Sequence, residues 1–151
     1  MLELLEVKEG RFVSLDKIAN VNILPDKTVL NMSYSIRKDN QYLSDYYYTD
    51  LLNDAKIEML LKSGFIHIKG EDREAYINPK HLSGIKFIPS GSAYANNLNK
   101  IIFLFSHDVG RADNTFAEYM SIVCDDETYK KFKTDIYNDT SRFSYTRFWK
   151  F

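Results

Sequence analysis

The amino-acid sequence predicts an α+β fold of two tandem, similar modules. Each is an antiparallel β-sheet of about four strands closed by one helix, and the two are packed as one compact unit through their apolar faces. Aromatic residues make up 15% of the 151 residues, and such side chains favour half-buried strands. Two stretches, RFVSLDKIANVNILP and EAYINPKHLSGIKFIP, repeat one apolar pattern. Each half also ends in a segment with helical spacing of apolar residues.

The two stretches align at an offset of 64 residues. Phe12 falls on Tyr76 and Pro25 falls on Pro89, in a chain with only 3 prolines. An insertion within SGSAYANNLN raises the offset to 72 for the rest of each half, and loops accept insertions because closure entropy grows slowly with length. The sequence therefore predicts a duplicated module.

The first module spans residues 1–64. Its expected elements are a short opening strand, a long strand at 12–24, strands at 29–36 and 42–49, and a helix. LPDKT and RKDNQ between the strands have the composition of turns. Asn53 or Asp54 can cap the helix at its start, and Gly64 suits the left-handed position that ends it.

The second module spans residues 65–151 and includes an aromatic and basic C-terminal segment. Its expected strands are FIHIKG, AYINPKHLSGIKFI, KIIFLFS and FAEYMSIVC, and its expected helix is DDETYKKFKTDIYN. Pro79 removes a ladder donor and Gly84 often marks a bulge. We therefore expect the second of these strands to be bent or broken, with NPKHLSG as a loop or one helical turn.

Composition limits the class of protein. A formal net charge of −1 gives no overall attraction to nucleic acid or anionic lipid. The N-terminal MLELLEVKEG lacks the regions of a signal peptide, and no stretch approaches the roughly 18 apolar residues of a membrane span. The single Cys124 excludes an internal disulfide and stands beside carboxylates that disfavour a thiolate. We expect a cytoplasmic protein without membrane segment, metal or cofactor, and a buried Cys124.

The segment SHDVGRADNT, at 106–115, is the densest polar loop in the sequence. Its candidate side chains are His107, Asp108, Arg111 and Asp113. Imidazole and carboxylate groups together can transfer protons or bind a divalent ion. The same residue types also occur in hairpin loops, where Asp and Asn bond their own backbone. Both interpretations stay open, and neither a catalytic residue nor a metal ligand is assigned.

The C-terminal TSRFSYTRFWKF alternates cations with aromatic rings. The candidate partner-binding residues are Arg142, Phe143, Tyr145, Arg147, Phe148 and Trp149. Trp, Tyr and Arg dominate protein hot spots, whereas stacked rings with cations also suit single-stranded nucleic acid. A final strand with its aromatic side chains in the core is the third interpretation.

Three hypotheses for function follow. The first is a non-catalytic binding or assembly protein that contacts another protein or itself, for example as a homodimer. The second is a nucleic-acid-associated accessory protein using the C-terminal segment and the helix lysines Lys130, Lys131 and Lys133, with weak, salt-sensitive binding. The third is a hydrolase-like enzyme centred on the 106–115 loop. The sequence lacks phosphate-loop, dinucleotide, zinc-protease and serine-hydrolase motifs, which favours the first hypothesis.

Overall fold

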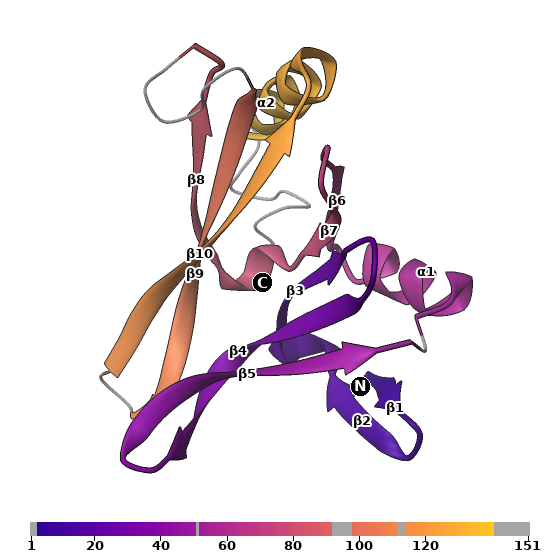
Figure 1. The fold of residues 1–151 in the computed structure, drawn as a ribbon, viewed down its shortest axis with the longest axis vertical. Coiled ribbons are helices and arrows are strands. Elements are labelled where there is room, and N and C mark those ends of the chain that lie inside the picture. Colours follow the sequence, from indigo (N-terminus) through magenta and orange to yellow (C-terminus); the bar gives the residue numbers. More distant parts are fainter. Residues whose placement is uncertain (1–2, 51, 92–97, 112–113, 141–151) are drawn as a thin grey trace.

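A computed structural model describes residues 3–50, 52–91, 98–111 and 114–140, which contain ten strands and two helices and form a mixed α+β fold (Figure 1). The first half of the chain contains, in order, β1 (Leu4–Lys8), β2 (Arg11–Ser14), a 3-10 turn η1 (Leu15–Lys17), β3 (Ile18–Ile23), β4 (Thr28–Lys38), β5 (Gln41–Thr49) and α1 (Asp54–Lys62). The second half contains β6 (Ile66–Lys69), β7 (Glu74–Ile77), η2 (Pro79–His81), β8 (Leu82–Ile88), β9 (Asn99–Arg111), β10 (Asn114–Cys124) and α2 (Asp126–Thr140).

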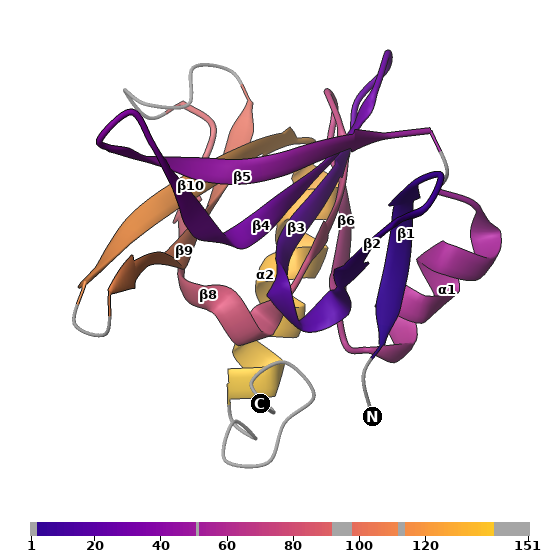
Figure 2. The same ribbon diagram turned by 90° about the horizontal axis from the view of Figure 1, so that it is seen from below.

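Antiparallel pairing groups these strands into three sheets. β1 and β2 form a hairpin, β5-β4-β3-β7-β6 form a five-stranded sheet, and β8-β9-β10 form a three-stranded sheet. A single parallel pair, Tyr34 with Asp108, links β4 of the second sheet to β9 of the third. Figure 2 shows the long β4–β5 and β9–β10 hairpins crossing on one side of the molecule.

Each half has five strands among the described residues where about four were expected, because the predicted strands at 12–24 and at AYINPKHLSGIKFI are each two strands. Residues Leu15–Lys17 form one 3-10 turn between β2 and β3, and Leu15 is buried at this turn. Alternation of apolar residues cannot reveal such a break, since a three-residue turn also returns the chain to the same buried face. In the second half the break was expected, and Pro79 begins the corresponding turn, with the Asn78 side chain accepting a hydrogen bond from the Lys80 amide at 3.1 Å.

The two halves meet edge to edge rather than through apolar faces as expected. β7, from the second half, pairs with β3, from the first, and places Tyr76 opposite Val21. The Asn78 side chain donates to the Ile18 carbonyl at 2.9 Å, and the Lys80 ammonium lies 3.3 Å from a carboxylate oxygen of Asp16. Strand pairing and the two 3-10 turns therefore join the halves.

Two hydrophobic clusters form the core, and each contains one helix. The first packs Leu60 of α1 against β1, β3 and β4, with Leu5, Val21 and Leu30 fully buried. The second packs α2 against the inner face of the three-stranded sheet. It contains aromatic contacts between Phe132 and the rings of Phe87 and Phe103.

Local sequence signals set the start of α1 and the tight turn between the long strands β4 and β5. The Asn53 side chain accepts a hydrogen bond from the Lys56 amide at 3.0 Å, so Asn53 is the cap of α1. Asp39 and Asn40, between β4 and β5, both have positive φ, as a two-residue hairpin turn of the type that matches strand twist requires. Within the described part of the chain, neither helix is long and apolar enough to cross a membrane.

Candidate binding surfaces

The outer face of the three-stranded sheet is the first candidate surface. α2 covers the inner face of this sheet, so the side chains that alternate outward have no helix against them in the described residues. Tyr119 is 72% exposed and Leu104 is 37% exposed. Large aromatic and aliphatic side chains left in water at neighbouring strand positions are typical of interaction surfaces.

This outer face is hollowed over a volume of about 550 Å³. The residues that line it are Lys86, Ile88, Lys100, Ile102, Leu104, Tyr119 and Ser121. They come from β8, β9 and β10, so a stiff sheet holds all of them in place. The lining includes two ammonium groups and no carboxylate. It therefore favours a partner whose surface combines apolar side chains with negatively charged ones. We call these seven residues the outer face.

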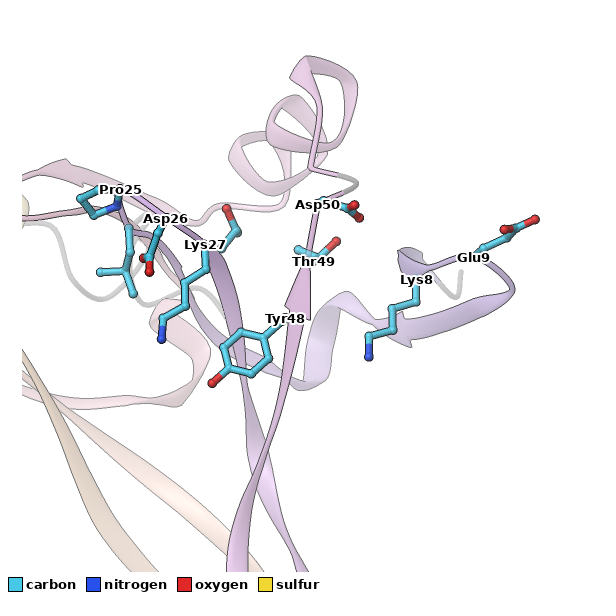
Figure 3. Close-up of a pocket in the computed structure, with 10 residues that line it drawn as sticks. Lys8, Glu9, Pro25, Asp26, Lys27, Tyr48, Thr49 and Asp50 are labelled. Atoms are coloured by element: carbon cyan, nitrogen blue, oxygen red, sulfur yellow. The ribbon is translucent and has the colours of Figure 1, made fainter.

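A second hollow, of about 770 Å³, lies between the ends of β1 and β5 and the β3–β4 turn in the first half (Figure 3). The end of β1 contributes Lys8, the β3–β4 turn contributes Lys27, and the end of β5 contributes Tyr48. The Lys27 ammonium lies 5.3 Å from the centre of the Tyr48 ring, a cation–π contact. Figure 3 shows Lys8 and Lys27 extending to the same side, with the Tyr48 ring between them. Glu9, Asp26 and Asp50 also line the hollow, so it has no single sign of charge.

The candidate polar loop is shorter in the structure than in the sequence interpretation. β9 continues to Arg111 and β10 begins at Asn114, so His107 and Asp108 are strand residues. Their backbones pair with Phe116 and Thr115 of β10. Asp113 and the side chains of 107–111 lie outside the described residues. The role of this group stays a prediction, as does that of the six C-terminal candidates, since 141–151 also lie outside the described residues.

Two histidines have assigned contacts. The His81 ring nitrogen Nε2 lies 2.5 Å from the Asp16 carbonyl oxygen and so helps to join the two 3-10 turns. Burial lowers the pKa of His81, which keeps the ring neutral at neutral pH. The His67 ring stacks on Tyr76 with centroids 4.6 Å apart, and its Nε2 lies 3.1 Å from a carboxylate oxygen of Glu74. The Tyr76 hydroxyl donates to that same oxygen at 3.1 Å.

Burial and the Glu74 carboxylate raise the pKa of Tyr76 to about 12, so its hydroxyl stays protonated and remains a donor. Cys124 is buried, as expected, and burial together with Asp125 and Glu71 raises the pKa of its thiol to about 11. A thiol with so high a pKa is a poor nucleophile. Among the described residues, no three His, Cys, Asp or Glu side chains come together as a metal site.

No protein-family model, curated protein or solved structure matches the chain. The candidate surfaces are therefore defined by the geometry above. The sequence interpretation missed the outer face, although one signal was present. In the apolar run IIFLF, Ile102 and Leu104 alternate with buried Ile101 and Phe103, so the strand has an apolar outward face as well as an apolar inward one.

Proposed function

We propose that this chain is a non-catalytic binding or assembly protein that acts through protein–protein contacts, and that its outer face is the contact surface. The observation that carries the proposal is the combination of exposed Tyr119 and Leu104 with two lysines on one rigid sheet. Tyrosine is one of the residue types that supply most of the free energy of such contacts, apolar neighbours keep water out of them, and surrounding cations add selectivity for an acidic partner.

We further propose that the two halves, 1–64 and 65–151, are one module used twice. The order of elements is the same in both halves. The 3-10 turns begin at Leu15 and Pro79, 64 residues apart, and the helices begin at Asp54 and Asp126, 72 residues apart. An irregularity in strand pairing follows Ile18 in one half and Leu82, 64 positions later, in the other.

The test compares a substitution on the outer face with a matched one elsewhere. Leu104→Glu and Tyr119→Ser should each lower the amount of protein that the immobilised chain retains from an extract of its source cells by about fivefold or more, since removing one anchor costs more than about 1 kcal/mol. Tyr137→Ser removes a similarly exposed tyrosine from α2 and should change nothing. Light scattering of the purified variants reports self-association in parallel.

Equal retention and equal mass for all these variants would refute the outer face as the contact surface. Deleting residues 142–151 is an independent arm. If the deletion alone abolishes retention, the C-terminal segment carries the binding rather than the sheet. Fluorescence anisotropy with labelled single strands at low salt tests the nucleic-acid hypothesis, which no contact among the described residues favours.

A further inference from the structure

The junction between the halves provides a pattern for a second contact. β7 has partners on both sides, since it pairs with β6 and with β3. In this arrangement Tyr76 lies opposite Val21 and is only 4% exposed. β7 thus joins β6 to the strands of the first half in one five-stranded sheet, and it covers one edge of the first cluster.

The strands at the matching positions, 64 residues away, have no such partner. β2 corresponds to β7 and pairs only with β1, and β8 corresponds to β3 and pairs only with β9, as far as the described residues extend. Each therefore presents one row of backbone donors and acceptors without a strand beside it. Such edges add strands from other chains readily.

The side chains at these two edges are only partly buried, and those of β2 could cover those of β8 as β7 covers β3. Phe12 matches Tyr76 but is 55% exposed. Ile85 matches fully buried Val21 but is only partly buried. Phe87 and Ile136 lie with Ile85 at the margin of the second cluster and are also partly buried. The exposed Phe12 ring and the open core margin at Ile85 therefore match the two residues, Tyr76 and Val21, that already lie opposite each other inside the chain.

We infer that β2 of one copy of this chain adds to β8 of a second copy, in the register of the internal β3–β7 pair, with Phe12 opposite Ile85. The inference rests on the proposed function and names its partner as a second copy. A chain's own β2 does not supply the strand. Val13 and Leu15 hold it in the first cluster, and in both views the β1–β2 hairpin and β8 lie on different sides of the molecule (Figures 1 and 2). Two copies can exchange both strands and close a dimer, or continue head to tail.

The register also predicts a substitution that should strengthen the association by changing a charge. It places Arg11 opposite Lys86, because Ala75 and Asn22 are opposite each other at the matching positions. Like charges opposite each other weaken strand pairing. Lys86→Glu should therefore tighten the self-association by about threefold or more.

The experiment begins with light scattering of the purified full chain over a dilution series. The mass should rise above the 17.7 kDa of one chain as concentration increases. Phe12→Ser should raise the concentration needed for half-association by about tenfold or more. Tyr46→Ser, which removes an equally exposed aromatic ring from β5, is the matched control and should leave it unchanged. Circular dichroism checks that each variant is folded.

Disulfide trapping then identifies the strands. Phe12→Cys and Ile85→Cys variants, mixed in equal amounts in a glutathione buffer, should form the mixed disulfide, because opposite residues of paired strands bring their Cβ atoms within about 5.5 Å. Phe12→Cys mixed with Tyr119→Cys should form little. Mass spectrometry distinguishes these products and any that involve the buried Cys124.

Each result decides the inference. A mass of one chain at all concentrations, with no mixed disulfide, would overturn it while leaving partner capture by the outer face intact, so the two proposals fail separately. Self-association that is indifferent to Phe12→Ser and weakened by Lys86→Glu would also overturn it. An intrachain disulfide formed at high dilution in the double variant Phe12→Cys/Ile85→Cys would show that the chain's own β2 fills the edge.

Discussion

Gly70 packs so closely against β10 that even one added methyl group should destabilise the fold. A Cβ at Gly70 would lie 2.4 Å from Cγ2 of Ile122 and 2.7 Å from the Val123 carbonyl oxygen. The Glu71 amide donates to that same carbonyl at 2.8 Å, so the backbone oxygen cannot move away without loss of a hydrogen bond. Ile122 is fully buried, and its side chain has no free space to enter.

The expected loss of stability follows from two opposing effects. Inserting a methyl group into a packed site costs about 1–3 kcal/mol. Replacing glycine recovers about 0.4–1 kcal/mol by restricting the unfolded chain. Gly70→Ala should therefore lower the free energy of unfolding by about 1–2 kcal/mol. With a slope of about 2 kcal/mol per molar urea, the unfolding midpoint should fall by about 0.5–1 M.

The control is Gly84→Ala, where the added Cβ would lie 3.4 Å from the nearest atom, Cδ1 of Leu104. That distance is ordinary van der Waals contact, so only the gain from restricting the unfolded chain remains, and the urea midpoint should lie between the wild-type value and about 0.5 M above it. Both unfolding curves are measured at protein concentrations at which the chain is monomeric. A Gly70→Ala midpoint equal to that of Gly84→Ala would refute the close packing of the β6–β7 turn on β10.

Two further predictions concern titratable groups. Burial lowers the pKa of His81 in the folded state, so the unfolded chain binds a proton first as the pH falls below about 6.5. The free energy of unfolding should therefore decrease below this pH, whereas above it His81 should make no pH-dependent difference. Melting temperatures between pH 5.5 and 7.5 should fall less steeply with acid for His81→Gln, and equal slopes would contradict this. Cys124, with its buried thiol of pKa about 11, should resist alkylation at pH 8 until urea unfolds the chain. Rapid labelling of the native protein would show that the thiol is accessible.

Features governed by neighbouring residues could be predicted from the sequence. Asn53 caps α1 because its own side chain reaches an amide three residues ahead, and Pro79 breaks its strand because its ring removes a donor. The first 3-10 turn has no such marker. Asp16 and Lys17 there are compatible with either a strand or a turn, so only the packing of the buried Leu15 selects the turn.

Pairing between distant strands could not be predicted, because it depends on which edges meet in space. Nothing in the letters around Tyr76 indicates that β7 pairs with β3 as well as with β6 of its own half. The same holds for the candidate surfaces. Leu104 and Phe103 are neighbours of similar apolarity, yet one faces water and the other faces α2, and the position of α2 is a property of the whole fold.

The placement of β7 has a consequence for how the chain folds. By sequence β7 belongs to the second half, but by hydrogen bonding it belongs to the sheet of the first. Its pairing with β3 brings together residues more than about 50 positions apart, and contacts of such separation slow folding because a long loop must close first. We expect one cooperative unfolding transition for the whole chain. A fragment ending near Gly64 would leave β3 as a bare, apolar sheet edge and should aggregate rather than fold alone.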